Sequence, residues 1–145
     1  MFKKILIPTD GSDLSLIAID KAIFFANEID AQIIGVTVTE PFHLVSTDIV
    51  MVSDSIEVFE RDMQQLAQKR LQRIKTKCDE MAMDCKLIHK VAHHPYEEIV
   101  LTAKENECDI IFMASHGRKG ISALLIGSEV NKVLAHTKIP VLVFR

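Results

Sequence analysis

Short apolar runs alternate regularly with longer amphipathic segments along this chain. Five runs have the length of strands, and they cover residues 5–8, 33–38, 87–91, 109–114 and 139–144. The first and fourth runs are solidly apolar, which is typical of strands covered on both faces. Strands that alternate with helices imply right-handed crossovers and a parallel sheet. The sequence therefore predicts an α/β fold with a doubly wound, five-stranded parallel sheet.

Helical spacing fills the segments between these runs. Apolar residues spaced three or four apart predict a first helix with one buried face; they are Leu14, Ile17, Ala18, Ala22, Phe25, Ala26 and Ile29. A long second helix is expected over residues 56–81, with a stripe of core residues at Ile56, Phe59, Met63, Leu66, Ile74, Cys78 and Met81. Pro95 and Gly127-Ser128 mark the starts of two further helices. Residues 40–54 are rich in turn-forming types and are expected to form a long connection.

Length and composition limit the function classes. The 145 residues are the size of one domain, so residues 1–145 are predicted to form a single domain. The net charge of -3 argues against nucleic acid as a partner, because a nucleic-acid footprint is strongly basic. No apolar run approaches the roughly 18 residues of a membrane span, and Pro8 ends the first run too early for a secretory signal. We therefore expect a cytoplasmic protein that binds neither nucleic acid nor membranes.

The cysteines support this expectation. There are three of them, Cys78, Cys85 and Cys108, and they form no CxxC motif. An odd number without metal or disulfide spacing is typical of a reducing compartment, where the thiols are packed and inert.

Open parallel sheets bind ligands at the carboxyl ends of their strands, where the strand order reverses. The loop after the first strand, residues 8–12, and the loop after the fourth, residues 114–122, carry polar and glycine residues. The loop after the third strand is short, Ala92-His93-His94. A site between loops one and four requires strands one and four to be neighbours, which predicts the order 3-2-1-4-5. The alternative flavodoxin-like order 2-1-3-4-5 would use the sparse third loop.

The fourth loop has the chemistry of a phosphate site. Gly117 and Gly120 allow backbone N–H groups to approach an anion, and Arg118 and Lys119 add positive charge. Gly127-Ser128 adds a helix N-terminus and a hydroxyl. Neither a P-loop triplet nor a GxGxxG fingerprint after the first strand is present, so a P-loop engine or a standard NAD site is not expected.

Three segments together resemble one known family. They are Ile7-Pro8-Thr9-Asp10-Gly11-Ser12, then Ser115-His116-Gly117 with nine residues before Gly127-Ser128, and last Ile139-Pro140-Val141-Leu142-Val143. In this order they resemble the universal stress protein family, over the whole chain. The resemblance implies a Rossmann-like fold of the adenine nucleotide alpha hydrolase type. It also implies a small regulatory stress-response protein that binds ATP, ADP or AMP, with or without Mg²⁺, and is not an enzyme beyond slow ATP hydrolysis.

The resemblance also assigns candidate contacts by motif position. The adenine is expected beside Pro8, Thr9, Asp10 and Val36, the ribose beside Met113 and Ala114, and the phosphates on Gly117, Gly127 and Ser128. Glu129 follows where the family often has valine. Its carboxylate is expected either to point away from the phosphates or to repel them unless Mg²⁺ lies between.

One position departs from the motif of the nucleotide-binding branch. That motif is G-x-x-G, nine residues, then G-S or G-T, and here its first glycine is Ala114. If the position needs only close approach, a methyl group costs some affinity; if it needs positive φ, the site is damaged. Ala114 and Glu129 therefore leave open an alternative, a homodimeric partner-binding module without nucleotide. A third alternative, an enzyme on a similar fold, has only Asp10 and Asp13 as nearby acids.

Other residues have simpler interpretations. In the simpler interpretation, Asp10 only caps the first helix or braces its turn, and Ser128 is only a helix N-cap. His116 is expected to be an exposed loop residue, and the adjacent His93 and His94 seldom suit one metal ion, so no catalytic residue and no metal site are predicted.

A homodimer is expected through the last strand, residues 139–144. In the order 3-2-1-4-5 that strand is an edge, and it is apolar with an aromatic end. Such an edge favours antiparallel pairing with a second copy about a twofold axis.

Overall fold

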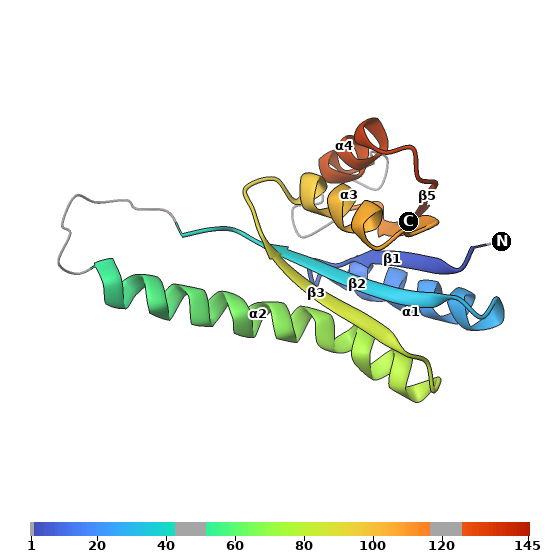
Figure 1. Cartoon of the computed structure of the whole chain (residues 1–145), viewed down its shortest axis with the longest axis horizontal. Helices are drawn as coiled ribbons and strands as arrows, with labels where there is room; N and C mark the ends of the chain where they lie inside the picture. Colours follow the sequence, from blue (N-terminus) through green and yellow to red (C-terminus); the bar gives the residue numbers. More distant parts are fainter. Residues whose placement is uncertain (1, 43–51, 117–125) are drawn as a thin grey trace.

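The chain forms a five-stranded parallel sheet in the order β3-β2-β1-β4-β5 (Figure 1). The computed structural model describes residues 2–42, 52–116 and 126–145. The strands are β1 (Lys4–Pro8), β2 (Gln32–Thr39), β3 (Cys85–Val91), β4 (Ile110–Ala114) and β5 (Val141–Phe144). The helices are α1 (Asp13–Glu28), α2 (Val52–Glu80), α3 (Pro95–Glu105) and α4 (Ser128–His136). The predicted fold class and strand order are both confirmed.

Helices cover both faces of the sheet: α1 and α2 lie on one side, and α3 and α4 lie on the other (Figure 1). Along β1, Ile5 and Ile7 pack into the core beneath α1 and α2, whereas Leu6 packs into the core beneath α3 and α4. All three side chains are 0% exposed. The run is solidly apolar because both faces of this central strand are buried.

The register brings the carboxyl ends of three strands together. Pro8 at the end of β1 lies opposite Val36 of β2, and on the other side Leu6 lies opposite Ile111 of β4. Because β1 and β4 are neighbours, the residues that directly follow them leave the sheet side by side. The next helices along the chain, α1 after β1 and α4 after β4, lie on opposite faces of the sheet. This is the reversal point at which ligands bind in open α/β sheets.

The long helix begins earlier than predicted. α2 starts at Val52 rather than Ile56, so part of the predicted connection 40–54 is helical, and residues 43–51 lie outside the described part of the chain. Serine and aspartate favour helix first turns as strongly as loops, so the residue types at 53–55 did not separate the two.

The predicted stripe on this helix is only partly core. Ile74 and Cys78 are buried, but Ile56, Phe59, Met63, Leu66 and Met81 are only half-buried, while Ala67 and Leu71 also belong to the core. The 29 residues of α2 span about 43 Å at 1.5 Å per residue. An eight-residue strand such as β2 spans only about 26 Å. The first half of α2 therefore extends beyond the sheet (Figure 1).

Smaller differences affect the ends of the strands. β3 begins at Cys85, two residues before the prediction, and β5 begins at Val141 rather than Ile139. Pro140 still accepts a hydrogen bond from the N–H of Ile111, at 2.9 Å, but has no N–H of its own to donate. No helix in the described part of the chain is long and apolar enough to span a membrane.

Candidate functional site

Thr9, the first residue after β1, connects three elements. Its N–H donates to the carbonyl of Val36, at 2.9 Å. Its own carbonyl accepts from the hydroxyl of Thr37, at 2.8 Å, so both main-chain groups are fixed to β2. The Thr9 hydroxyl lies 2.7 Å from that of Ser15 in α1. Thr9 is only 6% exposed, so this side chain sets the path of loop one rather than offering a surface for a ligand.

A tight turn follows Thr9 and begins α1. Gly11 has φ +76°, a conformation that costs a residue with a Cβ about 1–2 kcal/mol. The N–H of Gly11 donates to the Thr9 hydroxyl at 3.2 Å, and the N–H of Ser12 donates to Oδ1 of Asp10 at 3.0 Å. Ser12 is the N-cap of α1 and accepts from the N–H of Ser15 at 3.3 Å. Asp10 thus braces the turn, and its half-exposed carboxylate stays at the carboxyl edge of the sheet.

Arg70 of α2 reaches the same edge, which the sequence did not indicate. Its Nη1 donates to the carbonyl of Val38 at 3.3 Å, and its aliphatic stem lies over Gly11, where a Cβ would be 3.0 Å from its Cγ. Nearby, Nε2 of His89 lies 2.8 Å from the hydroxyl of Thr39. Burial lowers the pKa of His89, and the positive charge of Arg70 lowers it further. His89 is therefore kept neutral, and Arg70 supplies the positive charge at this corner.

Loop four is held at its two ends by main-chain groups. After β4, the N–H of Ser115 donates to the carbonyl of Phe144 at 2.6 Å, and the carbonyl of Ser115 accepts from the N–H of Gly127 at 2.7 Å. A Cβ at position 127 would lie 2.8 Å from that carbonyl oxygen. The ends of the loop can meet only because Gly127 has no side chain. The predicted residues Gly117, Arg118, Lys119 and Gly120 lie outside the described residues.

The start of α4 is open toward this junction. Gly127 is the N-cap and makes no side-chain capping bond, so Ser128 is not the N-cap but the first helical residue, and it is exposed. The first bond within the helix runs from the N–H of Asn131 to the carbonyl of Gly127, at 3.1 Å. The N–H groups of residues 128–130 therefore have no partner within the helix, and the positive end of its dipole lies beside β4.

The remaining motif residues occupy the end of β4 and its neighbour. Met113 and Val36 are 6% and 1% exposed and belong to the core beneath α3 and α4. Ala114 ends β4 in strand conformation. Positive φ occurs among the described non-glycine residues only at Asp30, Ala82 and Glu107. Ala114, for which the resemblance predicts a motif glycine, therefore has an unstrained backbone and differs from glycine here only by a methyl group.

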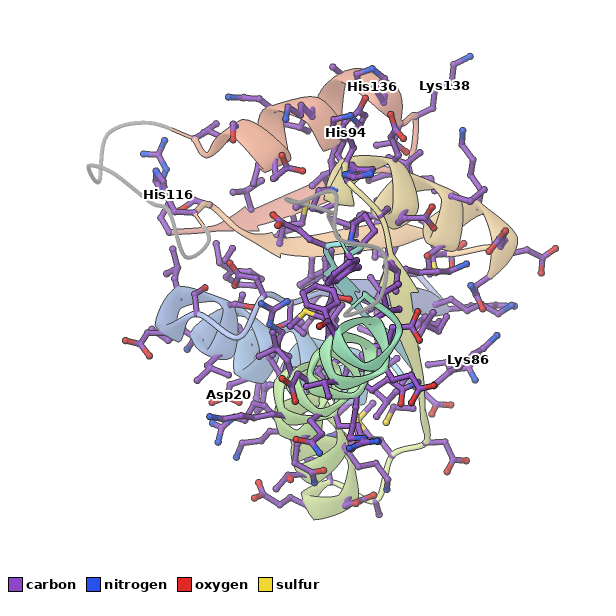
Figure 2. The ribbon with its side chains drawn as sticks, turned by 90° about the vertical axis from the view of Figure 1, so that its left-hand side faces the viewer. Asp20, Lys86, His94, His116, His136 and Lys138 are labelled. Atoms are coloured by element: carbon purple, nitrogen blue, oxygen red, sulfur yellow. The ribbon has the colours of Figure 1, made fainter. Side chains whose placement is uncertain are left out.

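His116 is half-buried rather than exposed. Its Nδ1 lies 3.0 Å from the Ser115 hydroxyl, and its Nε2 is buried with no hydrogen-bond partner in the described part of the chain. Figure 2 shows His116 where the ribbon of β4 ends. A Cβ at Gly127 would also come within 3.4 Å of its Cα. His116 thus belongs to the junction that holds loop four.

Glu129 points away from this junction and caps another helix. One carboxylate oxygen accepts from the N–H of Tyr96, in the first turn of α3, at 3.1 Å, and the other accepts from Nζ of Lys132 at 3.0 Å. His94, the N-cap of α3, makes no side-chain capping bond, so the carboxylate of Glu129 replaces it. The ring of Tyr96 lies 6.1 Å from that of His94 and 4.8 Å from that of His136, measured between centroids. Figure 2 shows His94 and His136 near one another.

The geometry brings loop one, the end of β2, Arg70 and the open start of α4 to one edge of the sheet. It offers helix N–H groups, a hydroxyl and a cation, which together suit an anionic ligand. Within the described residues no three His, Cys, Asp or Glu side chains are grouped as metal ligands require.

The sequence profile of the universal stress protein family matches residues 1–145. The chain belongs to this family. Universal stress protein MJ0531 of Methanocaldococcus jannaschii is 31% identical over 147 residues, which cover all of this chain and 83% of that protein. Universal stress protein MJ0577 of the same organism is 30% identical over 156 residues, which cover all of this chain and 96% of the relative. The solved structure of MJ0577 superposes with a TM-score of 0.83 at 29% identity, covering 99% of this chain and 95% of that one.

Other solved structures of this fold contain adenine nucleotides. A universal stress protein in complex with cAMP has a TM-score of 0.68 at 24% identity, and the alignment covers 97% of that protein. A universal stress protein family protein from Arabidopsis thaliana contains AMP, with a TM-score of 0.65 at 18% identity and 90% coverage. These two alignments cover 99% and 98% of this universal stress protein. At such identities they establish a shared fold.

Proposed function

We propose that this universal stress protein binds an adenine nucleotide, ATP, ADP or AMP, at the carboxyl edge of its sheet. The observation that carries the proposal is the junction of Ser115 and Gly127, which places the open N-terminus of α4 beside the end of β4. A helix N-terminus of this kind is a ready anion site. The cAMP and AMP complexes of structures with the same fold support the choice of ligand.

The phosphates are assigned to the start of α4, with Gly127 and Ser128 as contacts and Gly117 as a further one by its motif position. Ser128 is the better supported of these, because its exposed hydroxyl is not used as a cap. Binding of the triphosphate is proposed both with and without Mg²⁺.

The base is assigned to loop one, beside Pro8 and Asp10, where the buried Thr9 sets the path of the loop. The side chain of Val36 is buried, and its carbonyl is already bonded to Thr9. Val38 lies two residues further along the same face of β2 and is half-buried at the end of the strand. We therefore extend the base-binding surface to Val38, and place the ribose beside Met113 and Ala114.

The protein is proposed to act as a regulator in the cytoplasm rather than as an enzyme. The acids at the site are committed to other roles: Asp10 braces its turn, and Glu129 caps α3. A regulator needs only to bind nucleotide and respond, so slow hydrolysis at most is expected.

Equilibrium binding of ATP, ADP and AMP by calorimetry tests this proposal. Ser128→Ala is expected to weaken ATP binding severalfold, because a charged phosphate loses a hydroxyl donor. Thr76→Ala removes a hydroxyl from the exposed side of α2 and is the matched control, with unchanged affinity. Absence of binding by the folded protein at millimolar nucleotide would contradict the proposal and favour the partner-binding alternative.

We also propose that two copies pair through β5. This edge strand is the uncharged sequence Val141–Phe144, and Leu142 is 37% exposed. The opposite edge, β3, contains Lys86 and Lys90, and charged side chains of this kind blunt an edge. Leu142→Lys is expected to convert dimer to monomer in sedimentation. Val91→Lys, at an exposed position of β3, is the control that leaves the dimer intact. A wild-type monomer at tens of micromolar would refute the pairing.

A further inference from the structure

Two of the three cysteines lie in one interface, between the end of α2 and the start of β3. Cys78 continues the stripe of α2 that packs on the sheet, where Leu71 and Ile74 are also buried. Cys85 is the first residue of β3, and both cysteines pack into the core cluster beneath α1 and α2. Cys108 belongs to the core on the other side of the sheet.

A tight turn brings the two cysteines together. The N–H of Met83 donates to the carbonyl of Cys78 at 2.8 Å, and Ala82 has φ +54°, so the chain reverses directly after the helix. Cys85 then enters β3 opposite Ile33 of β2. Because Cys85 and Leu87 alternate onto the face that α2 covers, the Cys85 thiol points toward the helix that carries Cys78.

The two thiols are close enough to affect one another. Burial raises the pKa of Cys78 to about 12, and the neighbouring Cys85 side chain is the next cause of the increase. Asp79 raises it slightly and Lys75 lowers it slightly. Cys108 has no thiol beside it, and burial raises its pKa to about 11. The pair differs from Cys108 in having a second thiol within reach, although burial disfavours the thiolate of both Cys78 and Cys108.

We propose that Cys78 and Cys85 form a reversible intramolecular disulfide when the protein meets a small disulfide such as glutathione disulfide. The Cys85 thiolate, which is partly accessible, attacks one sulfur of the oxidant and releases one small thiol. Cys78 then loses its proton and attacks the sulfur of Cys85, which releases the second small thiol. Two protein thiols are oxidised to one disulfide, and the oxidant is reduced to two thiols.

The disulfide would link the end of α2 covalently to the start of β3. It closes a short loop and lies at the amino end of β3, whereas the proposed nucleotide site lies at the carboxyl ends of the strands. The disulfide is therefore independent of nucleotide binding. Because Cys78 is buried and protonated at neutral pH, we expect the second step to be slow and the mixed disulfide on Cys85 to precede it.

Mass spectrometry of the folded protein, incubated with glutathione disulfide and then alkylated, tests this inference. Trypsin cleaves after Lys77 and Lys86, so both cysteines fall in one peptide, 78–86, and Cys108 falls in another. The expected product is peptide 78–86 with two hydrogens lost and no alkyl group, which dithiothreitol reverses. Cys108→Ser is the matched control and forms the product at the wild-type rate. Cys78→Ser is expected to stop at the mixed disulfide on Cys85, and Cys85→Ser to form no adduct at Cys78.

The result that overturns the proposal is alkylation of both Cys78 and Cys85 after the mixed disulfide has formed and decayed. Formation of the intrapeptide disulfide only in urea overturns it equally, because the folded packing would then keep the sulfurs apart. If Cys108 formed a disulfide with Cys78 or Cys85 as readily as those two cysteines form one with each other, oxidation would follow unfolding and not the proximity of Cys78 and Cys85.

Discussion

The two loops that meet at the carboxyl edge are held in different ways. Beyond the two main-chain groups of Thr9 that bond to β2, loop one is fixed by side chains, because the hydroxyls of Thr9, Ser12 and Ser15 and the carboxylate of Asp10 all bond within the turn or to α1. Loop four is fixed at its ends by main-chain groups, the carbonyl of Ser115 and the N–H of Gly127. Side-chain hydrogen bonds hold loop one in place, whereas the ends of loop four can meet because Gly127 has no side chain.

The two halves of the site are therefore sensitive to substitution in different ways. Buried hydroxyl partners make the base side stiff, so substitutions there act first on stability. The phosphate side depends on one close approach, so a substitution there acts first on ligand binding.

The largest effect is expected from Gly127→Ala. The backbone of Gly127 has φ -59°, which alanine adopts freely, so the effect is purely steric. The added Cβ would lie 2.8 Å from the Ser115 oxygen, and overpacking of this kind costs about 1–3 kcal/mol. Where this cost falls on the nucleotide-bound state, ATP affinity drops by about 5- to 160-fold. Calorimetric titration measures it, and an unchanged affinity would show that the junction does not support the phosphates.

Thr9→Val tests the side-chain scaffold of loop one. Valine keeps the shape of threonine but leaves the Ser15 hydroxyl and the N–H of Gly11 without their partner. An unsatisfied buried group costs about 1–3 kcal/mol of unfolding free energy, measured as a lower urea midpoint at constant slope. The double variant Thr9→Val with Ser15→Ala should recover part of the loss, because both hydroxyls are then removed. A double variant less stable than the sum of the two single changes would contradict this reading.

Gly11→Ala separates conformational strain from contact. At φ +76° alanine is expected to cost about 1–2 kcal/mol of stability. Its Cβ also meets Cγ of Arg70 at 3.0 Å, but that stem is flexible and can shift. Adding Arg70→Ala relieves the contact and not the strain. The urea midpoint of the double variant should therefore remain below that of Arg70→Ala alone, and equal midpoints would assign the cost to the contact.

The sequence predicted the strand order because polar loops followed the first and fourth strands and not the third. Residues that form one site must lie at the same edge of the sheet, so the loops that carry them indicate which strands are neighbours. The ends of the helices and strands were harder to predict, since serine and aspartate, the residue types at 53 and 54, are as common in helix starts as in turns. The half-buried stripe of α2 could not be foreseen either, because periodicity identifies a face and not what covers it.

Arg70 and Glu129 show where sequence reasoning ends at the site. Arg70 lies on a helix rich in charged residues, and only the fold places its guanidinium at the Val38 carbonyl. From the sequence, the carboxylate of Glu129 could either point away from the phosphates or face them. The position of α3 decides between these, because the N–H of Tyr96 in its first turn donates to that carboxylate at 3.1 Å. Contacts between residues distant in the chain decide both cases, and residue type and spacing do not encode them.

Glu129→Gln gives the smallest expected effect and tests that choice directly. Glutamine keeps an oxygen for the N–H of Tyr96 but loses the charge that faces Lys132 and the positive end of the α3 dipole. A charge at a helix terminus is worth about 0.3–1 kcal/mol, so a slightly lower urea midpoint is expected. Affinity for ATP and its dependence on Mg²⁺ should stay unchanged, because the carboxylate serves α3 and not the phosphates. If the substitution instead strengthens ATP binding in the absence of Mg²⁺ but not in its presence, the carboxylate of Glu129 faces the phosphates and is part of the phosphate site.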